Sequence, residues 1–205
     1  MGILRSALGH NEVTDDFSRA NAVGAFSFGT SIGPESVNAE LADTGFLLAT
    51  DNRKLFVDKN TYGAMWLSTR VSGDETVHEV DLSEKKKEDL DRILKSQPLD
   101  RINLVDVPIS KVPSRSAGSW GMLKFIQQTM KEHGEPELNL IIVAQAHHVG
   151  RVAMQARKLG INPLIPAGLP RRFDRRSKQL WTRDLGLWVP YELLGSLELK
   201  RRGQL

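Results

Sequence analysis

The feature that most constrains the fold is a nearly continuous apolar run, Leu138–Ala146, which reads LNLIIVAQA. A helical pattern follows over residues 150–160, and a second short apolar run, INPLIP, comes directly after it. A continuous apolar run is typical of a strand in a parallel sheet, because helices cover both faces of such a sheet. The stretch therefore predicts a strand, a crossover helix and a second parallel strand.

The rest of the chain shows the same alternation. Further strands are expected over residues 21–29, 53–58 and 100–109, and further helices over 33–50, 60–70, 82–97, 114–134 and 189–202. This order predicts a three-layer, Rossmann-like α/β sandwich with a mainly parallel sheet. We expect one domain over residues 21–205, preceded by an N-terminal extension over residues 1–20.

Composition narrows the class of protein. The chain has 205 residues, of which 40% are hydrophobic and 26% charged, as in a soluble globular domain. It has no cysteine, which excludes disulfides, a thiol nucleophile and thiolate metal sites. The sequence contains neither a signal-peptide pattern nor an apolar stretch of about 18 residues. We therefore expect no membrane span and a cytoplasmic location.

The first strand is followed by the loop GAFSFGTSIG, which carries three candidate ligand-binding residues: Ser27, Gly29 and Thr30. Ligands of open α/β sheets bind beyond the carboxyl ends of the strands. The loop matches neither the dinucleotide fingerprint nor the P-loop. Its backbone N–H groups and hydroxyls suit a polar or anionic ligand, but an ordinary glycine-containing turn accounts for the same residues.

A cluster of serines precedes the helix expected to end at Gly134. Ser116 and Ser119 are each first of all a candidate helix N-cap, and as a group the serines could also line a polar pocket and contact a ligand. Neither Ser116 nor Ser119 stands at the centre of a Gly-x-Ser-x-Gly nucleophile elbow, so an esterase-like role is not supported for these two serines.

His148 and Arg151 stand three residues apart where the strand 138–146 gives way to a helix. On one helix face near its N-terminus, Arg151 could clamp a carboxylate or phosphate, and His148 could act as a catalytic acid or base. The alternative is that His148 caps the helix while Arg151 pairs with a nearby acid. The five histidines lack the spacing of a metal site, and none is expected.

These residues also carry a resemblance. The stretch from Ile141 to Pro166 is similar to the C-terminal half of the YdcF-like family of bacterial proteins (the YdcF, SanA and ElyC group), in which His-x-x-Arg opens a helix after an apolar strand. His148 and Arg151 match that pair, and the Trp-containing end of the chain resembles the family's last segment. A Ser-x-x-Thr-x-Glu-Asn run of the family aligns with residues 116–122, where Gly121 and Met122 replace the acid and the amide.

The resemblance implies a Rossmann-like fold with a ligand cleft at the strand ends, and S-adenosylmethionine as a possible ligand. The resemblance leaves open whether the protein is an enzyme. If it is one, we expect a transferase or a hydrolase. We therefore expect a soluble, divergent member that binds a small anionic or nucleotide-like ligand. The alternatives are a nucleic-acid-binding protein that uses the basic segment Arg171–Arg183, or a non-catalytic subunit of an oligomer.

Overall fold

The computed structural model describes residues 11–29, 31, 35–49, 53–58, 61 and 118–205, and the backbone of residues 104–106. Five strands form one sheet in the order β3-β2-β1-β4-β5, and every neighbouring pair is parallel. The strands are β1 (Ala22–Ala25), β2 (Lys54–Val57), β3 (Leu104–Asp106), β4 (Asn139–Val143) and β5 (Asn162–Leu164). The expected α/β class with a parallel sheet is confirmed.

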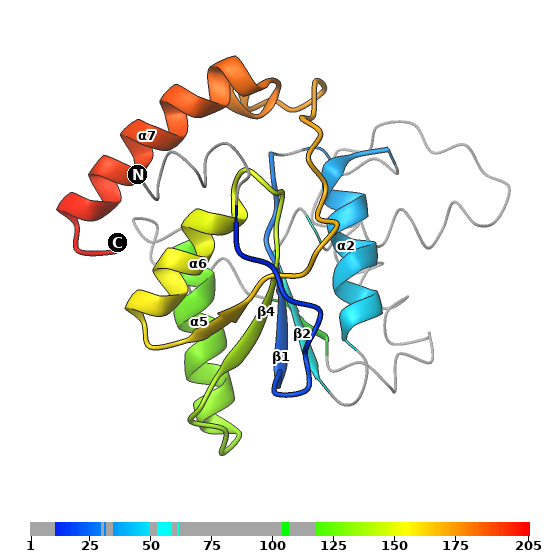
Figure 1. Cartoon of the computed structure of the whole chain (residues 1–205), viewed down its shortest axis with the longest axis vertical. Coiled ribbons are helices and arrows are strands. Elements are labelled where there is room, and N and C mark those ends of the chain that lie inside the picture. Colours follow the sequence, from blue (N-terminus) through cyan, green and yellow to red (C-terminus); the bar gives the residue numbers. More distant parts are fainter. Residues whose placement is uncertain are drawn as a thin grey trace, which may run out of the picture.

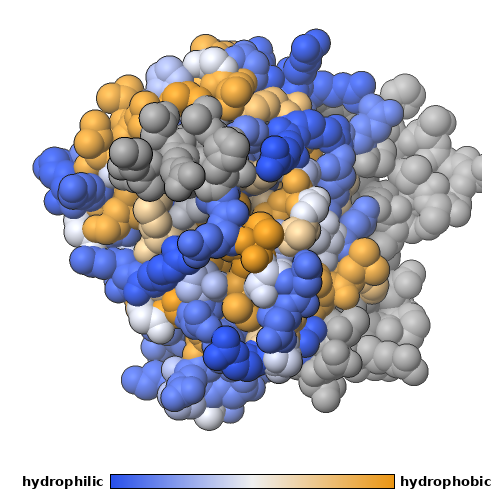
Figure 2. Space-filling view, viewed as in Figure 1, coloured by the Kyte–Doolittle hydropathy of each residue, from blue (hydrophilic) through white to orange (hydrophobic). Residues whose placement is uncertain are grey.

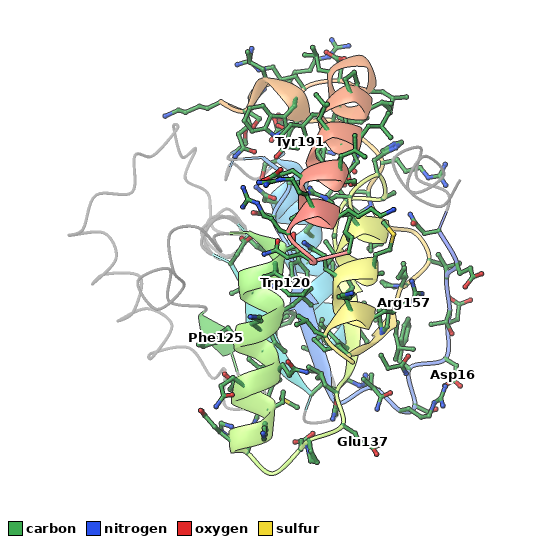
Figure 3. All side chains as sticks on the ribbon, turned by 90° about the vertical axis from the view of Figure 1, so that its left-hand side faces the viewer. Asp16, Trp120, Phe125, Glu137, Arg157 and Tyr191 are labelled. Atoms are coloured by element: carbon green, nitrogen blue, oxygen red, sulfur yellow. The ribbon has the colours of Figure 1, made fainter. Side chains whose placement is uncertain are left out.

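Helices lie on both sides of this sheet. Figures 1 and 3 show α5 and α6 on one side and α2 on the other. The helices are α2 (Val37–Leu48), α5 (Ser119–Glu132), α6 (Val149–Lys158) and α7 (Leu185–Arg201), with a short 3-10 helix, η3 (Leu180–Thr182). The apolar run of β4 is buried from Leu140 to Val143, as expected for a strand covered on both faces.

The order of the strands reverses between β1 and β4. The chain passes from β1 outward through β2 to β3, and then returns to place β4 on the other side of β1. Gly24 of β1 is opposite both Phe56 of β2 and Ile142 of β4. Ligands of open α/β sheets bind at such a switch, beyond the carboxyl ends of the strands.

The described part of the N-terminal extension packs onto the sheet. The backbone N–H of Thr14 donates to the carbonyl of Ile165 over 2.8 Å, and the side chain of Asn11 donates to the carbonyl of Ala146 over 2.9 Å. Further along the same segment, the carbonyl of Phe17 accepts a hydrogen bond over 3.1 Å from the guanidinium of Arg53, which directly precedes β2. Residues 11–20 thus run from the chain after β5, beside Thr14, to the start of β2, beside Phe17.

The last helix begins earlier than its sequence pattern predicts. We expected it from Val189, but α7 starts at Leu185 because the Asp184 carboxylate caps it, accepting from the N–H of Leu187 over 3.0 Å. The expected helix at 82–97 lies outside the described residues, as does nearly all of that at 60–70. Among the residues described, no helix has both the length and the apolar content needed to cross a membrane.

Candidate functional site

His148 stands at the junction between β4 and α6, in the N-cap position of the helix. Its backbone N–H donates to the carbonyl of Gln145 over 2.7 Å, which closes a tight turn after the strand. Its side chain makes no capping hydrogen bond to α6 and instead turns toward α5. The residue is only 6% exposed, so the imidazole lies inside the protein.

Three of the residues proposed from the sequence meet at this imidazole. Nε2 of His148 lies 3.2 Å from Oγ of Ser119, the first residue of α5. Nδ1 lies 3.1 Å from Nη2 of Arg151, one turn further along α6. The indole of Trp188 from α7 meets the same ring edge-on, with 5.8 Å between ring centroids. We call Ser119, His148, Arg151 and Glu192, described below, the His148 cluster.

The neighbours of His148 determine which of its nitrogens carries the proton. A guanidinium has donors only, so Nδ1 must accept the hydrogen bond from Arg151. Burial, and to a smaller extent the charge of Arg151, hold the pKa of His148 well below its usual value. The imidazole is therefore neutral, and its single proton is assigned to Nε2, which donates to the hydroxyl of Ser119.

Glu192 completes the cluster and was not singled out in the sequence. Its carboxylate lies 2.9 Å from Nε of Arg151, and their side chains are 1% and 14% exposed. Burial raises the pKa of Glu192 to about 7, although the Arg151 charge opposes this shift. Arg151 therefore pairs with a nearby acid, which is the alternative role that the sequence left open for it. One signal was available, since Glu192 is a lone acid in the run LGLWVPYELLGSL.

The four long helices of the described residues differ in how their N-termini are capped. At α2 the hydroxyl of Ser36 accepts from the N–H of Ala39, and at α7 Asp184 has the same role. At α5 the N-cap is Gly118, and neither it nor His148 at α6 supplies a side-chain cap. The two helices without such a cap are those whose N-termini lie at the His148 cluster. The helix dipole places a partial positive charge at each of these two N-termini.

The loop after β1 is engaged with the rest of the chain. The N–H of Ser27 donates to the Asp58 carboxylate over 2.8 Å. Gly29 has a φ of +81°, and a methyl group there would lie 2.7 Å from Oγ of Ser177 and 2.9 Å from Oγ1 of Thr182. This loop is thus packed under the segment that precedes α7. The remaining candidates, Thr30 and Ser116, lie outside the described residues.

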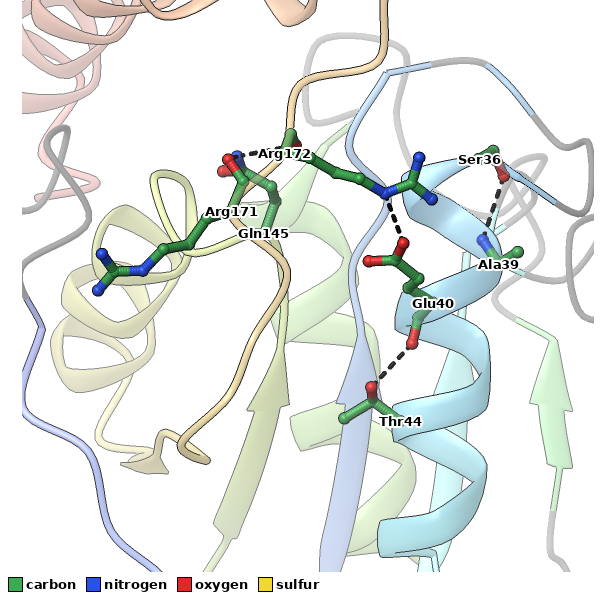
Figure 4. A network of polar contacts seen from close by, with 7 residues as sticks. All are labelled: Ser36, Ala39, Glu40, Thr44, Gln145, Arg171 and Arg172. Carbon is green, nitrogen blue, oxygen red and sulfur yellow. Dashed lines mark hydrogen bonds and ion pairs between the residues drawn. The ribbon is translucent and has the colours of Figure 1, made fainter.

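The basic segment Arg171–Arg183 crosses the same edge of the sheet. Figure 4 shows Arg172 reaching Glu40 of α2, while Gln145 holds the carbonyl of Arg171 from the end of β4. Arg176 pairs with Glu35 over 3.3 Å. Part of the basic charge is therefore paired with acids of the chain itself.

In the part of the chain that is described, no group of three or more His, Asp or Glu side chains is placed to hold a metal ion. No family model, curated protein or solved structure matches the chain. The resemblance to the YdcF-like family therefore stays a prediction, and function has to be argued from the geometry.

Proposed function

We propose that the protein binds a small ligand with an anionic group at the carboxyl edge of the sheet, between the N-termini of α5 and α6. The observation that carries this proposal is the chain of donors in the His148 cluster. Arg151 donates to Nδ1 of His148, Nε2 donates to Oγ of Ser119, and the Ser119 hydroxyl proton remains to be donated to a third group. The third group must accept a hydrogen bond, as carboxylate and phosphate oxygens do.

The surrounding helices favour a negative charge on that acceptor. The first N–H groups of α5 lack a side-chain cap, and the helix dipole is positive at this end. Ser119 is more exposed than His148, so a ligand would meet the hydroxyl first. In this proposal Ser119 contacts the ligand, His148 and Arg151 orient its hydroxyl, and Glu192 positions Arg151.

The nature of the ligand is proposed from the same chemistry. A nucleotide offers phosphate oxygens, and S-adenosylmethionine, which the family resemblance implies, offers a carboxylate. If the protein is a transferase or hydrolase, His148 acts as a neutral hydrogen-bond donor rather than as a base. The reason is that Nε2, the nitrogen facing Ser119, already carries the proton. This arrangement argues against activation of Ser119 as a nucleophile.

Calorimetric titration tests the proposal with three probes: inorganic phosphate, adenosine monophosphate and S-adenosylmethionine. We expect at least one to bind. Replacing Ser119→Ala should weaken it about ten-fold or more, because a hydrogen bond to a charged group is lost. Thr129→Ala, which removes a hydroxyl further along the same helix, should leave the affinity unchanged. Equal affinities for the Ser119→Ala variant and the unaltered protein would contradict the proposed role of Ser119.

Nucleic acid is the second candidate ligand, and the segment Arg171–Arg183 is the observation that favours it. Binding would have to depend steeply on salt, with roughly one unit of logarithmic slope for each phosphate neutralised. Two of its arginines are paired with Glu35 and Glu40, which lowers the charge available to phosphates. Filter binding of single-stranded and double-stranded oligonucleotides at low salt would eliminate this candidate if nothing is retained.

A further inference from the structure

Helix α7 has its apolar and polar side chains placed opposite to expectation. Leu194 and Leu197 are 69% and 62% exposed, whereas Glu192 and Ser196 on the inner face are 1% and 0% exposed. A surface helix of a soluble domain normally turns its apolar stripe inward and its charged residues outward. Here the inner face carries Trp188, Glu192 and Ser196, while Leu194 and Leu197 point into solvent.

The exposed leucines form a continuous stripe. Leu187, Pro190, Leu194 and Leu197 recur at intervals of three or four residues, which places them on one face of the helix. Leu180 and Leu185, also exposed, extend the apolar surface beyond the start of the stripe. Figure 2 shows hydrophobic side chains along the path of α7, with hydrophilic groups near both of its ends. Contiguous apolar surface of this kind marks an interaction site.

Basic residues precede and follow the stripe along the chain. Residues 171–205 contain nine Lys and Arg against four Asp and Glu, a formal charge of +5, although the whole chain carries only +3. Two of the four acids, Asp174 and Glu192, are buried. At the end of α7, Lys200, Arg201 and Arg202 outnumber Glu198, which is in contact with both arginines. The partner therefore has to be both apolar and negatively charged.

We propose that α7 docks onto the surface of an anionic lipid bilayer, with its axis in the plane of the membrane. The leucine stripe enters the boundary between headgroups and acyl chains, and the basic residues contact anionic headgroups. A second copy of this chain would bring two net positive regions together, since basic residues remain in excess after Arg172 and Arg176 pair with Glu40 and Glu35, so electrostatic repulsion opposes a dimer through α7. Nucleic acid would satisfy the charge but leave the leucines exposed to water.

Flotation of the whole protein with vesicles tests this proposal. We expect the protein to float with phosphatidylcholine vesicles that contain phosphatidylglycerol, and to float less with phosphatidylcholine alone. Each basic residue near an anionic surface contributes about 1 kcal/mol, so Lys200→Gln should weaken the partition coefficient about five-fold. Raising the salt concentration should weaken it further.

The leucines are tested by a double variant, Leu194→Gln with Leu197→Gln. Both side chains are exposed, so the fold should survive, and the loss of apolar insertion should weaken partitioning about ten-fold or more. Leu47→Gln is the matched control, because Leu47 is 72% exposed on α2, across the sheet from α5 and α6. Its partitioning should equal that of the unaltered protein.

Three results would overturn the proposal. The first is equal flotation with neutral and anionic vesicles, or none with either. The second is equal partitioning of the double leucine variant and the Leu47→Gln control. The third is a concentration-dependent dimer in analytical ultracentrifugation that the double variant abolishes, which would assign the stripe to a second copy of the chain.

Discussion

The carboxyl ends of β1 and β4 lie next to each other in the sheet, yet the residues that follow them make different contacts. After β1, the N–H of Ser27 is bound by Asp58, that of Phe28 by Asn38, and Gly29 packs against Ser177 and Thr182. After β4, the N–H groups of Ala146 and His148 are also bound, by the carbonyls of Pro170 and Gln145. At this end, however, α5 and α6 begin without a side-chain cap, and the His148–Ser119 contact joins their N-termini. The backbone of both ends is bonded within the protein, and the second end differs in the polar side chains that meet there.

This difference shows that a position at the carboxyl edge of a parallel sheet is not enough to identify a ligand site. The topology brings both loops to the switch between β1 and β4, but tertiary contacts decide whether polar groups remain available. A loop whose N–H groups already have acceptors gains little from a ligand, since the protein bonds would have to be replaced.

Trp188 should give the largest effect, because its side chain contacts both ends. It is buried, lies 4.9 Å from the ring of Phe28 after β1, and meets His148 after β4. We expect Trp188→Ala to lower the free energy of unfolding by about 4 kcal/mol, as for other large core truncations. Urea denaturation measures this loss.

Trp181 provides the control for that substitution. It is only partly buried and stacks on Tyr191 with 4.7 Å between centroids, so Trp181→Ala should cost about 1 to 2 kcal/mol. Equal losses for the two variants would show that Trp188 does not couple the two strand ends.

The substitution Gly29→Ala tests how tightly the loop after β1 is packed. The positive φ disfavours any side chain, and the methyl group would lie too close to Ser177 and Thr182, so we expect a loss of about 3 kcal/mol. Gly160→Ala is the matched control: Gly160 has a φ of +75° but no neighbouring atom within 4 Å of the added carbon. It should lose only about 1 kcal/mol in urea denaturation. Similar losses would contradict tight packing around Gly29.

The sequence predicted the sheet well because the signals were local. The apolar run of β4, the helical spacing before Gly134 and the turn at Gly160 each specify their element, and all three are found in the structure. His148 and Arg151 could be proposed together because they are three residues apart on one helix.

What could not be predicted were contacts between distant segments. Glu192 lies 41 residues beyond Arg151, and although it is a lone acid in an apolar run, the local pattern does not indicate that Arg151 is its partner. Likewise, the sequence of the Gly29 loop suits a ligand, and only the three-dimensional structure shows Ser177 beside it. Pairings of this kind depend on tertiary packing rather than on local pattern.

The third effect concerns the charge within the His148 cluster. Because the pKa of Glu192 is raised to about 7, the folded protein keeps a proton on this carboxyl after the unfolded chain has released it. Stability from this group is therefore lost as pH rises from about 4.5 to about 7. Glu192→Gln cannot titrate, so relative to the unaltered protein it should gain about 2 to 3 kcal/mol across that window.

Urea denaturation at about pH 4.5 and about pH 8 measures this difference. The pKa of His148 falls in both proteins, so its contribution cancels when they are compared. Glu198→Gln is the control: the hydrogen bonds from Arg201 and Arg202 lower the pKa of Glu198 to about 2, below this window. A parallel pH dependence of the Glu192→Gln variant and the unaltered protein would contradict a buried, neutralised Glu192.

The smallest effects compare the same substitution at a capped and an uncapped helix. Ser36→Ala removes the cap of α2 and should cost about 1 kcal/mol in unfolding free energy, with no change in the binding of any probe. Ser119→Ala removes the acceptor of the His148 Nε2 proton and should cost a similar amount. The two variants then differ in calorimetry alone, because only Ser119 offers its hydroxyl to a ligand. If Ser36→Ala weakened a probe as strongly as Ser119→Ala, the proposed distinction between the two kinds of helix N-terminus would be wrong.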